Sequence, residues 1–404
     1  MVEKGSRAQL FLTFPVRRKA AADHQRDAIV EITTSAICGT DLHFVRGTMA
    51  GMNPGTVLGH EAVGVVREVG PGVRNLRPGD RVVVPSTIGC GYCSCCRAGY
   101  FAQCDKANPN GAAAGTSFFG GPAPTGPVDG LQAEYARVPF ANVGPVWLPD
   151  EVSDDQAIML SDIYPTAYFG CRLAEIGHGD IALVLGAGPV GQFAVTSAFQ
   201  RGAGRVLVVD GIGSRLEQAR RRGAEAIDFN AEDPIEVIKE LTGGIGVDGV
   251  VDAVGVDAQK PKSGPAAGAV SSLEEAFEAE RKQAAPETNP SGGNWVAGDA
   301  PSLALRWAVQ AVAKAGTIGI IGVYPPAFET FPIGEAMNKN LTIKAGNCNH
   351  RRHIPRLLDL VRTGAIDPAS MLTQEVEVPS VLDAYATFDR RESGWTKVAL
   401  DVAS

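Results

Sequence analysis

Several features are missing from this sequence, and each absence narrows the class of protein. No apolar run approaches the ~20 residues that a helix needs to cross a bilayer, which argues against a membrane-spanning protein. Basic residues are not in excess, because 37 Lys and Arg against 45 Asp and Glu give a net charge of −8. Nucleic acids and anionic membranes both require a basic surface, so neither is expected as a partner. The chain also shows no tandem repeat of fixed period.

The pattern of a secretory signal is missing as well. The first residues, MVEKGSRAQLFLTFPV, include basic residues but only a short apolar stretch and no small-residue cleavage pattern. A cytoplasmic protein is therefore expected. In that reducing compartment, a high local density of cysteines indicates metal binding or catalysis rather than disulfides.

What is present is a globular composition in a chain long enough for two domains. Of the 404 residues, 45% are hydrophobic and 20% are charged. Short β segments are predicted at 28–37, 62–70 and 80–85, and the Gly- and Pro-rich stretch 111–130 is predicted to be an irregular loop. From about Asp180 the pattern becomes an apolar strand, a glycine turn, a helix and a second apolar strand. This order predicts a parallel sheet.

The stretch 257–300 interrupts the alternation of strands and helices. It is polar, with Pro and Gly around a short helical core at 271–284, and it is too long for an ordinary connection. We expect an insertion on the surface of the second domain. A helix followed by a strand is predicted to resume the regular pattern at 302–323.

Five of the eight cysteines lie in IGCGYCSCCRAGYFAQC, residues 88–104. All but Cys95 form a C-x2-C-x2-C-x7-C pattern: Cys90, Cys93, Cys96 and Cys104. Four thiolates complete the tetrahedral shell of zinc and leave no position for a substrate, so a structural zinc site is predicted. An iron–sulfur cluster is the alternative metal site, against which the x7 gap and the absence of a Cys-Pro pair count. Unligated thiols or a disulfide are the remaining alternative.

The glycine turn has the sequence GAGPVG. Gly186, Gly188 and Gly191 stand in G-x-G-x-x-G spacing, with Pro189 and Val190 before the last glycine. Because the turn follows an apolar strand and opens a helix, it predicts a dinucleotide site whose pyrophosphate lies at the helix N-terminus.

Asp210 closes the second strand of this unit. An acid at this place accepts hydrogen bonds from the ribose hydroxyls and repels a 2′-phosphate, so NAD is favoured over NADP. The neighbouring Arg215 weakens that preference, because an arginine there can lie beside the adenosine or tolerate a phosphate.

A third group of candidate residues is dispersed over three segments, ICGTDLH, GHEAVG and LSDIYPTAYFG. Cys38, His60 and Asp162 offer a thiolate, an imidazole and a carboxylate, which together with a water would make an open, catalytic zinc site. The residues alone leave other interpretations open: a buried core thiol, a satisfied histidine and a carboxylate that caps a helix.

The order of these segments resembles that of the zinc-dependent medium-chain alcohol dehydrogenases, over essentially the whole chain. The resemblance implies an α/β fold with a GroES-like, β-rich catalytic domain and a Rossmann domain containing a doubly wound parallel sheet. The implied parts are 1–160 with a structural zinc lobe at 88–105, 161–340 with the insertion 257–300, and 341–404, which returns to the catalytic domain. The family forms dimers and tetramers, so a homo-oligomer is expected.

The resemblance also assigns roles around the catalytic metal. Cys38 and His60 match the first two zinc ligands. Glu61 matches an acid that sits behind the metal and can become a transient ligand, and Asp41 would orient His60. Two zinc ions per chain are therefore implied, one catalytic and one structural.

Other matches concern the proton and the cofactor. Thr40 and His43 match a hydroxyl and a base that pass the proton of the substrate to solvent. Val254 and Gly322 are implied contacts of NAD, and Lys397 matches a position that can reach its pyrophosphate.

Many members of the family use a cysteine as the third zinc ligand, where this chain has Asp162. That departure resembles the glutathione-independent formaldehyde dehydrogenase and formaldehyde dismutase branch. The branch also carries a long insertion that folds over the adenosine half of NAD and holds the cofactor tightly. The stretch 257–300 is implied to do the same.

These features imply hydride transfer between NAD and a primary alcohol or a small aldehyde such as formaldehyde, with dismutation as one form of the reaction. A polyol or secondary-alcohol dehydrogenase is the alternative enzyme. A non-catalytic zinc- or nucleotide-binding regulator is the alternative from another class, against which the joint presence of Cys38, Thr40, His43, His60 and Asp162 counts.

Two sets of residues stay open at this point. The basic segment 347–356, NCNHRRHIPR, could clamp a phosphate, although such clusters are more often simply solvated. Phe118, Phe119 and Trp295 are candidates for the substrate pocket and equally for ordinary core.

Overall fold

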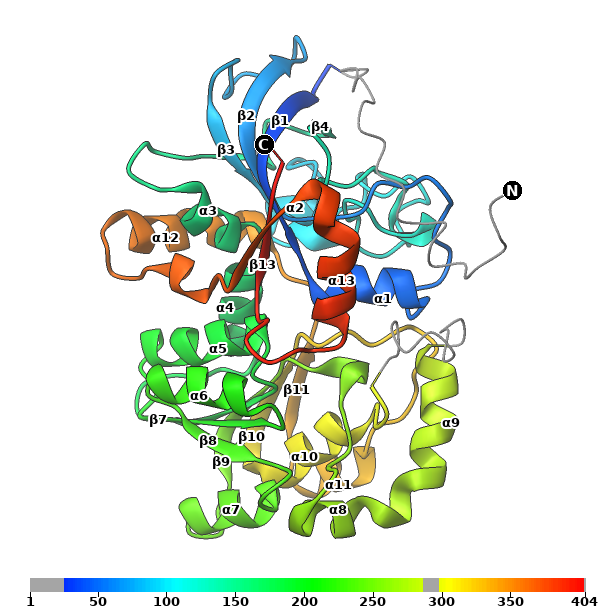
Figure 1. The fold of residues 1–404 in the computed structure, drawn as a ribbon, viewed down its shortest axis with the longest axis vertical. Coiled ribbons are helices and arrows are strands. Elements are labelled where there is room, and N and C mark those ends of the chain that lie inside the picture. The colour runs from blue at the N-terminus through cyan, green and yellow to red at the C-terminus, as the bar shows by residue number, and fades with distance from the viewer. Residues whose placement is uncertain (1–24, 286–297, 403–404) are drawn as a thin grey trace. The chain divides into compact units, whose positions relative to one another are not determined.

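The computed structural model describes residues 25–285 and 298–402, and it divides into two compact units (Figure 1). The first unit contains the described residues up to Pro165 and those from Asn347 onward. The second unit contains the described residues from Thr166 to Gly346.

The limits of the two units differ from the predicted boundaries at 160 and 340. Residue 160 lies inside helix α3 (Asp154–Ser161), which packs on strands of the first unit. Residue 340 precedes strand β11 (Thr342–Ala345), which pairs in parallel with β10 (Val312–Ile320) of the second unit. Packing and strand pairing therefore move both boundaries a few residues toward the C-terminus.

The first unit is built on a seven-stranded sheet in the order β12-β13-β1-β2-β3-β5, with β4 paired to β1. Its strands are β1 (Ala28–Ile37), β2 (Ala62–Val69), β3 (Arg81–Val84), β4 (Tyr135–Val138), β5 (Val146–Trp147), β12 (Gln374–Glu377) and β13 (Val398–Asp401). The predicted β segments at 28–37, 62–70 and 80–85 are β1, β2 and β3. They are rich in Val and Ile, whose branched side chains suit a pleated sheet.

The long strand β1 connects distant parts of the chain within the first unit. It pairs antiparallel with β2, β4 and β13, and the register Ile37↔Val398 sets the last strand beside the end of β1. The helices of this unit are α1 (Gly39–Arg46), α2 (Ser94–Arg97), α3, α12 (His350–Arg362) and α13 (Val381–Asp389), and α4 (Ile163–Leu173) leads into the second unit. Helix α1 begins two residues after β1 ends, so the chain turns sharply at Cys38.

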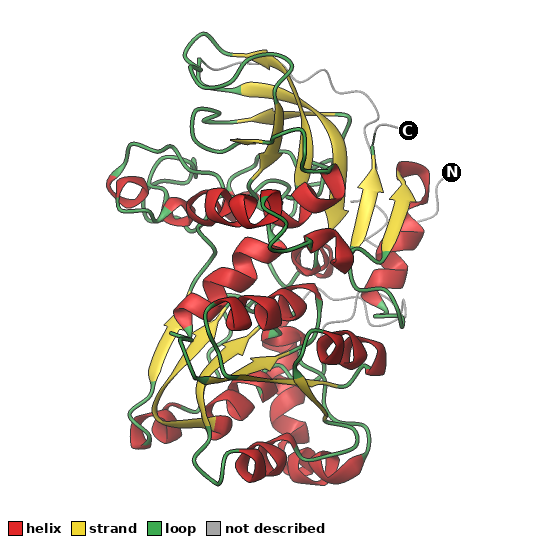
Figure 2. Ribbon diagram, turned by 90° about the vertical axis from the view of Figure 1, so that its left-hand side faces the viewer, coloured by secondary structure: helices red, strands yellow, loops and turns green. Residues whose placement is uncertain are grey.

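The second unit contains a six-stranded sheet in the order β11-β10-β9-β6-β7-β8, in which all pairings are parallel (Figure 2). The remaining strands are β6 (Ile181–Leu185), β7 (Arg205–Asp210), β8 (Glu225–Asp228) and β9 (Val247–Asp252). The helices are α5 (Pro189–Gln200), α6 (Gly213–Arg221), α7 (Pro234–Leu241), α8 (Gly264–Val270), α9 (Glu274–Ala284), α10 (Leu303–Ala311) and α11 (Ile333–Asn338). The strand order runs outward in both directions from the β6–β9 pair, which confirms the predicted doubly wound sheet.

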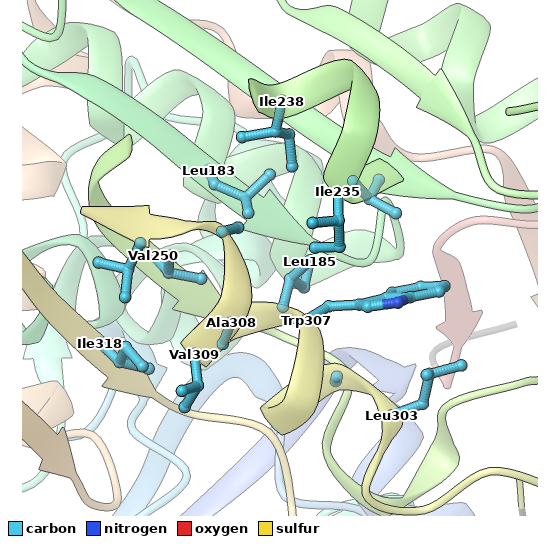
Figure 3. Close-up of a cluster of buried hydrophobic side chains, with 14 of the residues drawn as sticks. Leu183, Leu185, Ile235, Ile238, Val250, Leu303, Trp307, Ala308, Val309 and Ile318 are labelled. Atoms are coloured by element: carbon cyan, nitrogen blue, oxygen red, sulfur yellow. The ribbon is translucent and has the colours of Figure 1, made fainter. Parts of the chain in front are cut away.

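A buried apolar cluster supports this sheet (Figure 3). Leu183 and Val250 come from the central strands β6 and β9, Ile238 comes from α7, and Trp307 comes from α10. Burying one such side chain contributes ~1.5–3 kcal/mol, so the cluster holds both helices on the sheet.

The insertion contains more buried structure than its polar sequence predicted. The predicted helix at 271–284 begins at Glu274, and a second helix, α8, precedes it. Phe277 is 2% exposed and joins the apolar cluster, while Glu280 accepts a hydrogen bond from the Ser302 backbone N–H at 3.1 Å. The described part of the insertion is therefore packed on the second unit, and Trp295 lies outside the described residues.

Candidate active site

The four-cysteine lobe has the geometry of a closed metal site. The sulfur atoms of Cys90, Cys93, Cys96 and Cys104 all lie within 4.8 Å of one another, and all four residues are buried. Backbone N–H groups donate to three of these sulfurs, from Cys90 to Cys104 Sγ at 3.2 Å, from Cys93 to Cys90 Sγ at 3.4 Å and from Cys96 to Cys93 Sγ at 3.4 Å. Such donors stabilise thiolates, and four buried thiolates suit zinc. Cys95 stands apart, with its Sγ 3.7 Å from Asp105 Oδ1.

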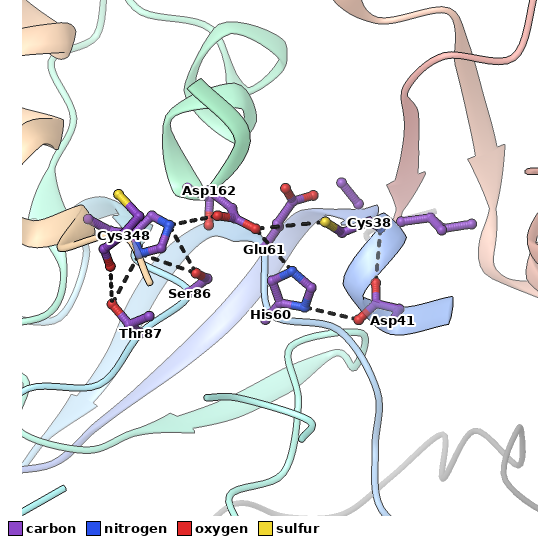
Figure 4. A network of polar contacts seen from close by, with 12 residues as sticks. Cys38, Asp41, His60, Glu61, Ser86, Thr87, Asp162 and Cys348 are labelled. Carbon is purple, nitrogen blue, oxygen red and sulfur yellow. Dashed lines mark hydrogen bonds and ion pairs between the residues drawn. The ribbon is translucent and has the colours of Figure 1, made fainter. Parts of the chain in front are cut away.

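The dispersed candidates meet at a second buried group (Figure 4). One donor atom from each of Cys38, His60, Glu61 and Asp162 lies within 4.8 Å of the others. The pairing Ser35↔Ala62 between β1 and β2 places His60 and Glu61 beside Cys38. Asp162 joins them from the junction between α3 and α4.

The imidazole of His60 is oriented from behind. Its Nδ1 lies 3.0 Å from Asp41 Oδ1, and the other oxygen of Asp41 accepts the Cys38 backbone N–H at 3.0 Å. With Nδ1 bonded to a carboxylate, Nε2 is directed at the donor group, 3.1 Å from Asp162 Oδ2. The Cys38 sulfur lies 3.8 Å from the same Asp162 oxygen.

The electrostatics of the group favour a positive charge at its centre. Burial alone would raise the pKa of Asp162, but the charge and hydrogen bond of His350, with those of His60, hold that pKa well below its usual range. Burial would likewise lower the pKa of His60, yet the negative charges of Asp41 and Cys38 raise it well above its usual value. A divalent cation would meet the same demand for positive charge, and a thiolate, an imidazole and carboxylates are all zinc ligands.

Glu61 belongs to the same donor group and is fully buried. Its Oε2 forms an ion pair with Lys397 Nζ, which also donates to the Ile37 carbonyl at 3.1 Å. Its Oε1 has no hydrogen-bond partner within the described chain, which fits an oxygen that turns toward a metal. Burial raises the pKa of Glu61 to about 7, against the opposing charge of Lys397. The contact of Lys397 with the cofactor pyrophosphate stays a prediction, and in this structure its ammonium group is buried and paired with Glu61.

The sequence analysis missed His350, which belongs to this group. It is the first residue of α12 and 2% exposed, and its Nε2 lies 2.6 Å from Asp162 Oδ1. On the other side of the ring, Nδ1 lies 3.0 Å from Thr87 Oγ1. Within segment 347–356, Cys348, Asn349 and His350 are therefore buried rather than solvated. A buried carboxylate ligand needs a hydrogen-bond donor for its second oxygen. The prediction of Asp162 as a ligand therefore implied such a donor, although it did not say which residue supplies it.

The predicted proton relay lies on α1, next to the donor group. Thr40 and His43 are three residues apart, which places them on the same helical face. Thr40 is half-buried and His43 is 4% exposed, so His43 is not a surface histidine.

In the second unit, the glycines of GAGPVG have different reasons for being glycine. Gly186 has a φ of +87°, and a Cβ on Gly191 would lie 1.8 Å from the Gly186 carbonyl oxygen. The fold itself therefore requires these two residues. Gly188 has an ordinary φ of −67°, and a Cβ there would meet only Arg215, at 3.8 Å. Nothing within the described chain requires glycine at 188, so it fits the close approach of an outside group such as a pyrophosphate. Pro189 and Val190 follow as the first residues of α5.

The other predicted cofactor residues lie at the carboxyl ends of the parallel strands. Asp210 ends β7, and its oxygens accept backbone N–H groups from Ala187 at 2.7 Å and from Gly211 at 2.8 Å. Val254 follows β9 and would be 2.5 Å from a Cβ on Gly186, while Gly322 follows β10. Ligands of doubly wound sheets bind at this edge.

The aromatic pocket candidates resolve differently. Phe119 is 2% exposed and belongs to the core of the first unit, together with Val82, Val84 and Leu131. It is an ordinary core residue, whereas Phe118 is half-buried.

Comparison with known proteins now adds to this geometry. Residues 24–150 match the model of the alcohol dehydrogenase GroES-like domain, and residues 189–262 match the model named zinc-binding dehydrogenase. A zinc-type alcohol dehydrogenase-like protein of Bacillus subtilis, AdhB, itself described as uncharacterized, is 37% identical and covers 93% of both chains. The chain belongs to the zinc-type alcohol dehydrogenase family. It is therefore an oxidoreductase of a family that acts on small alcohols.

Further similarities within the zinc-type alcohol dehydrogenases concern the fold and the branch. The solved structure of alcohol dehydrogenase TADH from Thermus sp. ATN1 matches with a TM-score of 0.76 and 32% identity over 95% of both chains. The glutathione-independent formaldehyde dehydrogenase of Pseudomonas aeruginosa is 39% identical over 57% of this chain and 58% of its own length. These findings confirm the predicted family and fold. In the part of the chain that the structure describes, no helix is long and apolar enough to cross a membrane.

Proposed function

We propose that this protein catalyses hydride transfer between NAD and a primary alcohol or a small aldehyde, with formaldehyde as the first substrate to test. The observation that carries the proposal is the buried grouping of Cys38, His60, Glu61 and Asp162. The carboxylate of Asp162, at the position where many relatives have a thiolate, supports the formaldehyde-oxidising branch. The partial similarity to the Pseudomonas aeruginosa enzyme supports the same branch.

Each donor group has a separate task in this proposal. Cys38, His60 and Asp162 hold the catalytic zinc, with Glu61 as a transient fourth donor. The structural zinc is held by Cys90, Cys93, Cys96 and Cys104. A zinc ion with three protein ligands supplies a Lewis acid for the substrate oxygen. Thr40 Oγ1 would accept the proton of the substrate hydroxyl while it donates its own hydroxyl hydrogen, and His43, one helical turn further along α1, would pass a proton on to solvent.

NAD lies on the glycine turn of the second unit in this proposal. Gly188 admits the pyrophosphate to the N-terminus of α5, whose unpaired backbone N–H groups favour an anion. Asp210 uses its remaining lone pairs for the ribose hydroxyls, which favours NAD over NADP. Val254 and Gly322 provide backbone at the same edge of the sheet.

The test uses purified protein and formaldehyde with no added cofactor, followed by proton NMR. Dismutation converts two formaldehyde molecules and one water into one methanol and one formate, because the hydride removed from one molecule reduces the other. Equal amounts of methanol and formate support retained NAD and the formaldehyde branch. No turnover here, followed by turnover of primary alcohols with added NAD, supports the general reaction with exchangeable cofactor. Activity restricted to polyols or secondary alcohols would overturn the proposed substrate class.

The setting of the protein is part of the proposal. None of the eight cysteines, all of which the structure describes, forms a disulfide, which fits a reducing compartment such as the cytoplasm. A homo-oligomer is supported by the edge strand β11, which carries the exposed Ile343. Light scattering during size-exclusion chromatography measures the mass, and a monomer at micromolar concentration would contradict the oligomer.

A further inference from the structure

We propose that His350 is a positioning residue for the metal ligand Asp162. Together the two residues would present one fixed donor atom to the metal, as the cysteine thiolate of many relatives does. The inference rests on the zinc site proposed above. It extends that site by a residue of α12, far from the other members in sequence.

A carboxylate presents a problem that a thiolate does not. A sulfur offers one donor atom, whereas a carboxylate has two oxygens and can rotate, so it can bind a metal through either oxygen or through both. In this structure the two oxygens of Asp162 have different partners. Oδ1 lies 2.6 Å from His350 Nε2, and Oδ2 lies 3.1 Å from His60 Nε2 and 3.8 Å from Cys38 Sγ. His350 therefore determines which oxygen faces the donor group.

The His350 ring has a hydroxyl on its other side. Thr87 Oγ1 lies 3.0 Å from Nδ1 and donates its hydrogen to the Cys348 carbonyl at 3.4 Å, while Nε2 faces a carboxylate oxygen, which can only accept a hydrogen bond. From Nε2 the ring donates to Asp162 Oδ1. Ser86 Oγ lies 3.2 Å from Nε2 and 3.4 Å from Nδ1, and the side chains of Ser86, Thr87 and His350 are all buried.

Hydrogen bonds of the two asparagines before His350 attach this part of the chain to residues in and after the four-cysteine lobe. Asn349 Oδ1 accepts the Ala102 backbone N–H at 3.0 Å, and Asn347 Nδ2 donates to Thr116 Oγ1 at 2.6 Å. Ala102 lies between Cys96 and Cys104 in the chain. The ring of His350 thus starts from an anchored backbone, which is what a positioning residue requires.

The experiment compares three single variants with the wild type, all purified with zinc. His350→Gln keeps an N–H donor near the position of Nε2, His350→Leu removes it, and Asp162→Ala removes the ligand. His353→Gln is the matched control, because His353 is a buried histidine of the same helix outside the four-donor group. Zinc per chain, zinc affinity in competition with a chelator, and the visible spectrum of the cobalt-substituted protein are measured.

The expected result is a loss of the catalytic zinc alone in Asp162→Ala. His350→Leu should bind that zinc ~10–100-fold more weakly and shift the cobalt spectrum, as is typical when a partner of a metal ligand is removed. His350→Gln and the His353→Gln control should stay close to wild type. If His350→Leu does not fold, Thr87→Val carries the test: weaker retention of the catalytic metal supports the proposal, and an unchanged affinity and cobalt spectrum overturn it.

The decisive comparison repeats His350→Leu in a protein that already carries Asp162→Cys. A thiolate has no second oxygen to hold, so His350→Leu should weaken metal binding less than threefold there. Equal weakening in both backgrounds would mean that His350 acts only through packing, and would overturn the proposal. Unchanged affinity and spectrum in His350→Leu, with zinc lost from Asp162→Ala, would also overturn it while leaving the zinc site intact. Two zinc ions retained in Asp162→Ala would instead refute the proposed ligand set.

Discussion

The two donor groups of the first unit have the same number of donors and the same compactness, but the chain builds them in opposite ways. Both are buried, and in each the donor atoms lie within 4.8 Å of one another. The cysteines all come from one short segment, and backbone amides satisfy their sulfurs. Cys38 and Asp162 are 124 residues apart, and the partners of Asp162 and Glu61 are 188 and 336 residues away.

This difference shows how a closed site and an adjustable site are stabilised. Backbone amides have fixed positions, so the cysteine lobe holds its donors in one arrangement. Each acidic or imidazole donor of the mixed group instead has a polar side-chain partner: Asp41 for His60, Lys397 for Glu61 and His350 for Asp162. Side chains can move with the donor that they contact, as an active site that exchanges ligands requires.

The largest effect is expected from breaking the cysteine lobe. Cys96→Ser removes a buried thiolate, and the free energy of unfolding of the first unit should fall by ~5 kcal/mol or more, because structural zinc is worth ~10–16 kcal/mol in small domains. Zinc analysis should find one ion fewer per chain, and chemical denaturation should show the loss. Cys95→Ser is the matched control and should change stability by less than ~1 kcal/mol. An equal effect of both variants would contradict the four-ligand assignment.

Removing the third ligand of the mixed group should affect activity rather than folding. Asp162→Ala should lower kcat/KM by ~10³-fold, equivalent to ~4 kcal/mol of transition-state stabilisation, because the Lewis acid is lost. Steady-state kinetics with the best alcohol or aldehyde gives this ratio. The four-cysteine zinc should persist in the same sample, and full activity with one zinc per chain would refute the comparison between the sites.

The ion pair between Glu61 and Lys397 offers a test of whether a bound metal can replace the positive charge of the lysine. Lys397→Met leaves a buried carboxylate unpaired, which should cost ~3–5 kcal/mol of unfolding free energy in zinc-free protein. The loss should be smaller with zinc bound, since the cation then lies beside Glu61. Urea denaturation with and without zinc measures both. The surface pair Lys344–Glu175 supplies the control, and Lys344→Met should change stability by ~0–1 kcal/mol.

The smallest effect is expected from Gly188→Ala in the second unit. Gly188 leaves room for a ligand, whereas the neighbouring Gly191 is required by the fold. Gly188→Ala should raise the Kd for NAD by ~10-fold, or ~1.4 kcal/mol, with an unchanged melting temperature. Titration calorimetry and thermal denaturation check the two parts. Gly191→Ala should lose folded protein instead, because its Cβ would collide with the Gly186 carbonyl. Unchanged NAD affinity in Gly188→Ala would exclude a pyrophosphate contact at that residue.

How far the sequence could predict these sites follows from the distance between their parts. The spacing of Cys90 to Cys104 and the unit around GAGPVG are local patterns, and the structure places their residues as that spacing requires. Cys38, His60 and Asp162 could be grouped only through the family resemblance, since no local rule sets residues that far apart beside one another.

The carboxylate partners of His350 and Lys397 were not predicted, for a related reason. No local pattern links either residue to an acid so far away in the sequence, and only the folded chain shows that each faces a buried carboxylate. The insertion was judged by its polar composition, which gave no sign that Phe277 and Glu280 lie on the buried side of α9.

The pairing of β1 with β13 has a consequence for the folding of the protein during its synthesis on the ribosome. Thr34 to Ile37 are synthesised before residues 38–397, and their partners Val398 to Asp401 only after them. The cysteine lobe can close around its metal as soon as its own segment emerges. The mixed group cannot be completed before His350, Lys397 and β13 have been synthesised, so contacts of high sequence separation limit its assembly. A nascent chain stalled before Asn347 should therefore already carry zinc, yet only at the site that performs no chemistry.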